Sequence, residues 1–222
     1  MAMISHLGAM IPVVAGALMG RRFRGIEGTV GATCYGDGAT STGAFHEGLN
    51  LAAVEKLPLV VVIANNQYAY STPNSRQFVC EDLVDKAVGY GVAGHSVDGT
   101  DLQACLEVLD RAVSAARAGG GPQLVVASLL RLAGHGEHDD ASYVDPKLRD
   151  MPIGRDCLKV AEQRLLAKGW ADAESLRVMA DDAQRQVEEA VSTTMREAPP
   201  DPNTEDWCAL ATRHLSEGET LQ

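Results

Sequence analysis

The sequence predicts an α/β fold, with a mostly parallel sheet covered by helices on both faces and further helices at the C-terminal end. Strand-like and helix-like segments alternate over residues 8–131 and are joined by short links, as in folds with parallel sheets. Residues 57–64 form an almost unbroken apolar run, which is typical of a strand buried on both faces. Glycine, proline and capping residues mark the ends of most segments.

The first half of the predicted sheet lies before Asn65. Small residues at helical spacing predict a helix over residues 8–21, followed by glycines that end it and by a buried strand over residues 29–35. Ser41 or Thr42 can cap a second helix, which runs to Leu57 and ends at a proline. The apolar strand of residues 57–64 follows directly.

The second half of the sheet follows the same alternation. A short helix is expected over residues 80–91 and a short strand over residues 92–99. Asp101 can cap a helix that continues to about Ala118, and residues 121–131 read as another buried strand.

Beyond Arg131 the character of the sequence changes. Residues 132–152 form a polar loop of roughly twenty residues, a length that indicates function or mobility. Two amphipathic helices are expected after it, over residues 153–168 and 173–197, the second with an apolar stripe packed on a neighbour. A linker-like break then precedes a short tail.

These segments predict three parts of the chain. An α/β domain is expected over residues 1–150, a helical extension over residues 151–200 and a tail over residues 201–222.

Composition excludes several classes of function. The 222 residues carry a formal net charge of −11, which argues against a general binder of nucleic acids or anionic membranes. Five scattered cysteines with no CxxC pair encode neither a zinc knuckle nor a disulfide framework, so a reducing cytoplasm is the expected location. The apolar N-terminal run is interrupted by Pro12 and is too short to span a membrane, so we interpret it as a helix of the fold.

Two polar motifs follow two of the predicted strands. Asp37 lies between Gly36 and Gly38 after the first strand, and Asn66 follows the next strand. Ligands of parallel sheets bind beyond the carboxyl ends of the strands, so a carboxylate and an amide oxygen are expected to converge there. Such oxygens suit Mg²⁺, and the two glycines let the backbone approach a diphosphate at the start of the following helix. Either motif alone is a common turn, but the pair at this spacing is specific.

The same stretch resembles the thiamine diphosphate fingerprint, in which a GDG motif is followed, after a spacer of this size, by two asparagines. The run "GDGATSTGAFHEGLNLAAVEKLPLVVVIANNQYAYSTP" resembles the alpha subunit of the decarboxylating component of 2-oxo acid dehydrogenases, a group that includes the pyruvate, branched-chain and acetoin enzymes. The segments "GAMIPVVAGA", "GYGVAGHSVDGTD" and "LLRLAGHGEHDDASYV" resemble its other landmarks in the same order. The likeness covers nearly all of residues 4–200 and implies the thiamine-diphosphate-binding fold.

The resemblance assigns roles to individual residues. It implies that Asp37, Asn66 and the main-chain carbonyl of Tyr68 are ligands of Mg²⁺. It makes His135 the catalytic histidine of a mobile loop, which steadies the diphosphate or the intermediate and assists acyl transfer. The expected cofactor-binding residues are Ser5, Leu7, Gly36, Gly38, Ala39, Ala64, Arg131 and His135.

The resemblance also implies the reaction and the partners. The expected activity is oxidative decarboxylation of a 2-oxo acid, either pyruvate or a branched-chain acid, with transfer of the acyl group to a lipoyl-bearing acyltransferase. The glutamate that activates the cofactor normally comes from a beta subunit, and no glutamate of this chain matches it, so we expect a shared active site in a hetero-oligomer such as a heterotetramer. Family members carry a long segment before the part matched here, so a truncated or split alpha subunit is expected.

Two other functions remain open on the sequence. His135, His138, Asp139 and Asp140 lie close together in the polar loop and could form the metal centre of a hydrolase. Alternatively, the chain is catalytically empty and serves as a cofactor-binding or assembly piece, for which the small residues of its first helix would suit close packing on another subunit.

Overall fold

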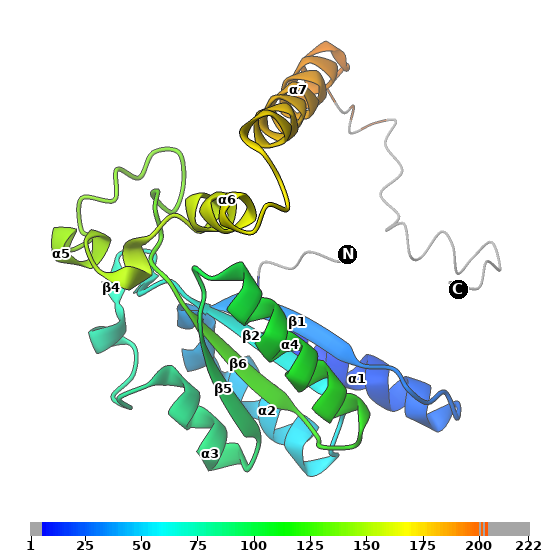
Figure 1. Ribbon diagram of the computed structural model, residues 1–222. Helices are drawn as coiled ribbons and strands as arrows, with labels where there is room; N and C mark the ends of the chain where they lie inside the picture. The colour runs from blue at the N-terminus through cyan, green and yellow to red at the C-terminus, as the bar shows by residue number, and fades with distance from the viewer. Residues whose placement is uncertain (1–5, 200, 202, 204–222) are drawn as a thin grey trace. The chain divides into compact units, whose positions relative to one another are not determined.

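The protein is built on a four-stranded parallel sheet with helices on both faces, which confirms the predicted α/β class (Figure 1). The computed structural model describes residues 6–199, 201 and 203. The strand order is β1-β2-β6-β5, and the helix between β1 and β2 covers the opposite face from the helix between β5 and β6. The strands are β1 (Gly31–Gly36), β2 (Leu59–Asn65), β5 (Ala93–Asp98) and β6 (Gln123–Ser128).

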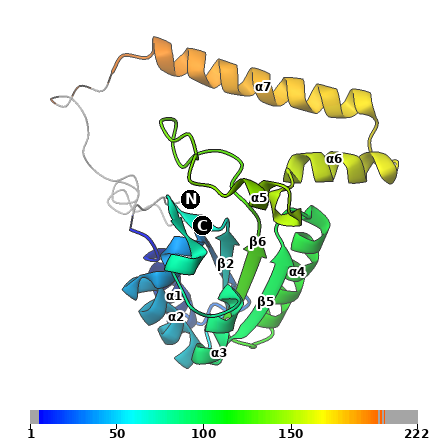
Figure 2. The same cartoon turned by 90° about the vertical axis from the view of Figure 1, so that its left-hand side faces the viewer.

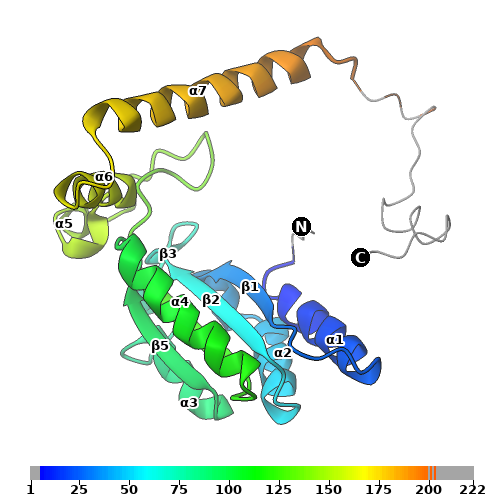
Figure 3. The same cartoon turned by 45° about the vertical axis from the view of Figure 1, so that its right-hand side comes forward.

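Alternate residues of the central strands enter two separate cores. On one face, the fully buried Phe45 and Leu49 of α2 pack with Val61 and Ile63 of β2. On the other face, Val60 of β2 packs with α4. Figures 2 and 3 show α4 on one side of the sheet and α1 and α2 on the other. These helices are α1 (Met10–Phe23), α2 (Gly43–Val54), α3 (Lys86–Tyr90) and α4 (Leu102–Arg117).

The helices begin where the sequence offers caps. The side chain of Thr42 accepts a hydrogen bond of 3.2 Å from the main-chain nitrogen of Phe45 at the start of α2. Asp101 accepts one of 3.1 Å from the nitrogen of Ala104 and caps α4 in the same way. The predicted caps of both helices are therefore confirmed.

The main deviation from the sequence analysis lies between β2 and β5. A small antiparallel hairpin forms there from β3 (Tyr68–Ala69) and β4 (Thr72–Pro73), where no strand was predicted. The helix predicted over residues 80–91 is shorter, because the 3₁₀ turn η3 (Leu83–Asp85) replaces its first part before α3 begins. Two further 3₁₀ turns, η1 (Asp37–Ser41) and η2 (Asn74–Arg76), precede α2 and follow the hairpin.

The polar loop after β6 is more structured than expected. It contains the short helix α5 (Pro146–Arg149) and the 3₁₀ turn η4 (Pro152–Gly154). The helix α6 (Cys157–Ala167) starts four residues later than the predicted Ile153, because η4 occupies that position and Asp156 then caps the helix at the nitrogen of Leu158.

The chain divides into two compact units, Met1–Trp170 and Ala171–Gln222. The second unit contains α7 (Ala173–Arg196), which confirms the predicted helix and begins at a capping box between Asp172 and Ser175. No residue of α7 is buried, so the packing of its apolar stripe stays a prediction. Among the residues described, no helix combines the length and the apolar character needed to cross a membrane.

Candidate functional site

A pocket of about 580 Å³ lies beyond the carboxyl ends of β1 and β2. The predicted position of the site is therefore the position of a real cavity. Two of the predicted residues do not line it: Ser5 lies outside the described residues, and Ala64 pairs with Gly36 in the sheet but does not reach the pocket. The lining residues are Leu7, Gly36, Asp37, Gly38, Ala39, Asn66, Tyr68, Ala69, Tyr70, Arg131 and His135.

Asp37 is the first residue of η1 and is only 1% exposed. Its Oδ2 oxygen accepts a hydrogen bond of 2.6 Å from Nε2 of Gln77. Its Oδ1 oxygen is buried and has no hydrogen-bond partner among the described residues. A buried carboxylate oxygen without a partner is costly unless a cation or a donor satisfies it. The site therefore holds one buried carboxyl oxygen at the end of β1 that has no partner among the described residues.

Asn66 and Tyr68 bring two further oxygens to the pocket. The side-chain oxygen of Asn66 accepts a hydrogen bond of 3.1 Å from the main-chain nitrogen of Tyr68, which turns the chain into the hairpin. The carbonyl of Tyr68 accepts one of 3.2 Å from Nη2 of Arg131. Each of these oxygens has a second lone pair, so neither contact uses up its capacity to bind a cation.

The neighbouring Asn65 has a different role from Asn66. It is 7% exposed, and its side-chain oxygen accepts a hydrogen bond of 2.7 Å from Nδ2 of Asn74. The nitrogen of Asn74 in turn donates to the carbonyl of Gln67 over 3.0 Å. Asn65 therefore holds the turn that follows the hairpin, and only the second asparagine of the pair faces the pocket.

Arg131 and His135 enter the pocket from the polar loop after β6. Nη1 of Arg131 donates to the carbonyl of Tyr70 over 2.8 Å and to the hydroxyl of Tyr143 over 2.7 Å. The imidazole of His135 lies edge-on against the ring of Tyr70, with the ring centres 4.8 Å apart. The hairpin thus fixes both residues: Tyr68 and Tyr70 anchor the guanidinium, and Tyr70 also packs on the imidazole.

Asp139 organises this loop from within. Its Oδ2 accepts hydrogen bonds from the nitrogen of His135 over 2.6 Å and from the hydroxyl of Tyr143 over 2.7 Å, and its Oδ1 accepts one from the nitrogen of Ala141 over 3.0 Å. These donors, the His135 amide first, lower the pKa of Asp139 to about 2. The carboxylate is therefore charged at neutral pH and holds the loop together.

The same contacts count against a metal centre of a hydrolase in this loop. The Asp139 oxygens are occupied by donors from the protein, and the His138 imidazole contacts the Tyr70 hydroxyl at 3.3 Å. Within the described part of the chain, no three histidine, cysteine, aspartate or glutamate side chains are grouped so that they could hold a metal ion. The alternative of a hydrolase metal centre in this loop therefore has no support in the described structure.

Two residues that support the site, Lys86 and Gln77, were not predicted from the sequence. The ammonium of Lys86 donates to the carbonyl of Thr40 over 2.8 Å and to its hydroxyl over 3.0 Å. Because Thr40 belongs to η1, these two hydrogen bonds stabilise the turn that carries Asp37. Lys86 also lies near the rings of Phe45 and Phe78, and its burial lowers its pKa. No local sequence signal marks Lys86 or Gln77, because both reach the site from segments that only the tertiary fold brings there.

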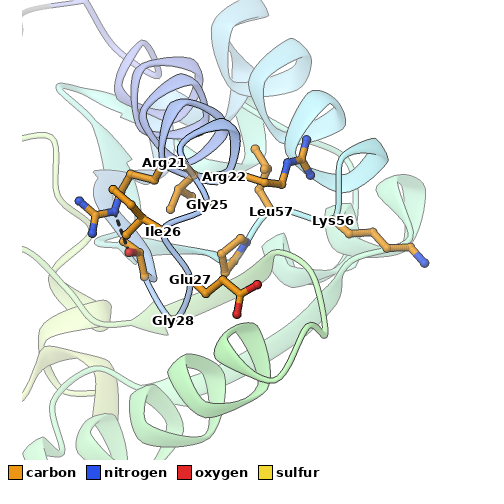
Figure 4. A pocket seen from close by; sticks show the side chains of 11 residues that line it. Arg21, Arg22, Gly25, Ile26, Glu27, Gly28, Lys56 and Leu57 are labelled. Atoms are coloured by element: carbon orange, nitrogen blue, oxygen red, sulfur yellow. Dashed lines mark hydrogen bonds between the residues drawn. The ribbon is translucent and has the colours of Figure 1, made fainter.

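A second pocket, of about 290 Å³, lies at the opposite end of the sheet (Figure 4). It is bordered by the end of α1 and by the segment that enters β2. Figure 4 shows the charged ends of Arg21 and Lys56 on opposite sides of this pocket. The Nε atom of Arg21 donates a hydrogen bond of 2.7 Å to the hydroxyl of Thr29. Arg22 is paired with the carboxylate of Glu55. These side chains do not converge on one point, so the pocket lacks the geometry of a charged-ligand site.

Comparisons with known proteins show which family the chain resembles. The model of the dehydrogenase E1 component family matches residues 1–203. The chain is 39% identical over 201 residues to subunit alpha of acetoin:2,6-dichlorophenolindophenol oxidoreductase from Cupriavidus necator, a match covering 90% of this chain and 60% of that protein. It is 30% identical over 196 residues to the pyruvate dehydrogenase E1 component subunit alpha of Rhizobium meliloti, covering 88% of this chain and 56% of the relative.

A third relative matches a shorter segment more closely. The chain is 47% identical over 114 residues to subunit alpha of 3-methyl-2-oxobutanoate dehydrogenase from Mycobacterium tuberculosis, which is 51% of this chain and 31% of the relative. The chain therefore spans no more than 60% of the length of these three relatives. Because the family model matches residues 1–203 of the 222, the chain belongs to the dehydrogenase E1 component family.

Proposed function

We propose that this chain supplies the metal-diphosphate half of a thiamine-diphosphate site in a 2-oxo acid dehydrogenase alpha subunit. Membership of the family implies thiamine diphosphate as the cofactor. The observation that carries the proposal is the free, buried Oδ1 oxygen of Asp37, which lies in the same pocket as Asn66 and Tyr68.

The donor set of the pocket fits a hydrated Mg²⁺ ion. Asp37 offers a carboxylate oxygen, Asn66 an amide oxygen and Tyr68 a main-chain carbonyl, all hard oxygen ligands of the kind Mg²⁺ prefers. Mg²⁺ usually takes few protein ligands and completes its shell with water and phosphate oxygens. Gly36 also lines the pocket, and a Cβ atom added there would meet no atom within 4 Å, which leaves room beside the carboxylate.

The hydrogen-bond donors of the pocket suit a diphosphate. Arg131 brings its guanidinium to the pocket with two main-chain carbonyls fixing its direction. His135 lies at the same rim, where its imidazole can donate a hydrogen bond to an anion or move a proton. We infer that Arg131 and His135 contact the phosphate groups or the reacting acid and that Leu7 borders the rest of the cofactor.

When bound, thiamine diphosphate supplies the carbanion and the electron sink that decarboxylation requires. The protein residues bind and orient it: Asp37, Asn66 and Tyr68 hold the metal, and Asp139 keeps the His135 loop in place through the amide hydrogen bond of 2.6 Å. Tyr70 packs edge-on against the imidazole of His135 and so orients it at the rim of the pocket.

We further propose the partners and the substrate class from the relatives. They are named as alpha subunits of pyruvate, acetoin and 3-methyl-2-oxobutanoate enzymes, so we infer a beta subunit that completes the active site and a hetero-oligomer. The proposed substrate is a small 2-oxo acid such as pyruvate or a branched-chain acid, and the proposed acceptor is a lipoyl-bearing acyltransferase. If the chain were instead a pure assembly piece, this pocket would bind no cofactor.

Calorimetric titration of the full chain with thiamine diphosphate tests the proposal. Binding is expected with Mg²⁺ present, and we expect it to disappear when Mg²⁺ is replaced by a chelator or when the chain carries Asp37→Ala. Asp140→Ala is the matched control, because Asp140 lies in the loop but does not line the pocket. Binding that is unaffected by Asp37→Ala would overturn the proposed metal site, and no binding by the wild-type chain would overturn the proposed function.

A further inference from the structure

Two buried side-chain atoms in the described part of the chain lack a hydrogen-bond partner, and both belong to one contact. They are Oδ1 of Asp37 and Oε1 of Gln77. The two residues are joined by the hydrogen bond of 2.6 Å from Gln77 Nε2 to Asp37 Oδ2. Buried polar atoms without partners are rare and costly in folded proteins. Their occurrence on both sides of a single short hydrogen bond points to a ligand next to the pair.

The side chain of Gln77 is held in one orientation. Besides Asp37, its Nε2 donates to the carbonyl of Thr72 over 3.0 Å and to the side-chain oxygen of Asn74 over 3.4 Å. Three acceptors therefore surround the amide nitrogen, and rotating the amide by 180° would put its oxygen against all of them. The direction of the amide follows from these contacts.

The main chain of Gln77 is anchored as well. The hydroxyl of Ser41, at the end of η1, donates to the carbonyl of Gln77 over 3.2 Å. The nitrogen of Gln77 donates to the carbonyl of Asn74 over 2.9 Å. Gln77 therefore ties η1, which carries Asp37, to the turn after the hairpin, so its amide is a fixed support for the carboxylate.

We propose that Gln77 is a positioning residue of the metal site, which holds Asp37 Oδ2 so that Oδ1 stays free and directed at the cation. A carboxylate with one oxygen bound to a fixed donor has lost its freedom to rotate, and such outer contacts commonly orient metal ligands. Asp37 lines the pocket and Gln77 does not, so Gln77 would act on the metal through the carboxylate that it holds. The inference rests on the proposed function, since it deepens the same site.

The test uses Mn²⁺ as a spectroscopic probe in place of Mg²⁺. The full chain with thiamine diphosphate is titrated with Mn²⁺, and free Mn²⁺ is followed by its electron paramagnetic resonance signal. Gln77→Met keeps the length of the side chain but removes both the donor and the acceptor. We expect Mn²⁺ affinity to fall about 10- to 100-fold, the usual effect of losing a contact that orients a metal ligand.

Gln123→Met is the matched control for loss of a buried amide. Gln123 is 2% exposed, lies at the start of β6 at the other end of the sheet, and donates to the carbonyl of Gly121 over 3.2 Å. This control is expected to lower the melting temperature without changing Mn²⁺ affinity. Melting of both variants without metal confirms that each still folds, so a loss of affinity confined to Gln77→Met reports on the site.

A double-mutant cycle separates positioning from general support. If Gln77 acts through Asp37, Gln77→Met weakens Mn²⁺ binding much less in an Asp37→Asn background than in the wild type. Additive losses would overturn the positioning role. If Asp37→Asn abolishes tight binding while Gln77→Met binds Mn²⁺ as well as the wild type does, only this inference fails. If Asp37→Asn leaves Mn²⁺ affinity unchanged, the proposed function fails as well.

Discussion

Gly38 is the position where one added methyl group is expected to disturb the site most clearly. A Cβ atom at Gly38 would lie 2.6 Å from the Cβ of Ala69, a separation that real Cβ atoms do not show. Gly38 does not adopt a left-handed backbone conformation, so the cost of Gly38→Ala is steric and not conformational. Ala69 belongs to β3 and cannot rotate away, so the hairpin that carries the Tyr68 carbonyl must move instead.

The expected size of the effect follows from overpacking. Forcing an extra methyl group into a packed site costs about 1–3 kcal/mol. For a unit of this size each kcal/mol shifts the melting temperature by about 2–4 °C, so a fall of roughly 2–12 °C is expected. Because the hairpin also carries a proposed metal ligand, Mg²⁺-dependent binding of thiamine diphosphate should weaken beyond what the loss of stability explains.

Differential scanning calorimetry and titration of Gly38→Ala test this, with two variants as controls. Gly36→Ala adds a methyl group that meets no protein atom within 4 Å, so its melting temperature should stay close to that of the wild type. Adding Ala69→Gly to Gly38→Ala removes the clashing atom and should restore most of the binding, although a glycine in the strand costs about 0.5–1 kcal/mol. If the double variant binds no better than Gly38→Ala, the steric explanation is refuted.

Three further changes test the supports of the fold and the loop. Phe45→Ala empties a fully buried position under the sheet and should destabilise the protein by about 3–5 kcal/mol in urea unfolding, whereas replacing the exposed His46 by alanine should cost far less. Asp101→Ala removes the cap of α4 and the ion pair with Arg164. Chemical denaturation should show that the free energy of unfolding falls by about 0.5–2 kcal/mol from loss of the cap. An unchanged free energy of unfolding would contradict the cap assignment. The pKa of Asp139 lies at about 2, below its ordinary value of 3.8, so folding favours the charged carboxylate. The hydrogen bonds to this carboxylate should therefore persist across pH 5–8 and be lost only as the pH falls through the acidic range toward 2. Asp139→Asn should speed hydrogen exchange of the His135 amide at every pH in that neutral range, and equal exchange rates would contradict the role given to the carboxylate.

The sequence was sufficient for the sheet and for most of the pocket. Apolar runs located β2 and β6, whose residues are mostly buried. The strands β1 and β5 followed from their place in the alternation with helices, and the prediction that β1 is buried is wrong, because each of its residues is at least partly exposed. The GDG and asparagine motifs located the residues at the strand ends, because parallel topology brings carboxyl ends together. Asp37 and Asn66 therefore followed from short segments alone.

The remaining supports depended on long-range contacts that leave no local signal. Gln77 reaches Asp37 across 40 positions of sequence, and Lys86 reaches Thr40 across 46. The hairpin at Tyr68 was missed because its strands have two residues each, too few for an alternating pattern. The hydrolase alternative lacks support for a related reason, although His135, His138 and Asp139 lie close together in the sequence. Asp139 accepts hydrogen bonds from the loop itself, His138 contacts the Tyr70 hydroxyl, and the His135 imidazole packs on the Tyr70 ring.

The central claim, that Asp37 and Asn66 hold a divalent metal in this pocket, is tested most directly by anomalous diffraction. Crystals of the full chain grown with Mn²⁺ and thiamine diphosphate would reveal the metal at the manganese absorption edge. The account predicts a single strong peak bound by Asp37 Oδ1, the Asn66 side-chain oxygen and the Tyr68 carbonyl, with metal–oxygen distances slightly above the roughly 2.0–2.1 Å of Mg²⁺. A peak at His135 and His138 instead, or none at Asp37, would contradict it.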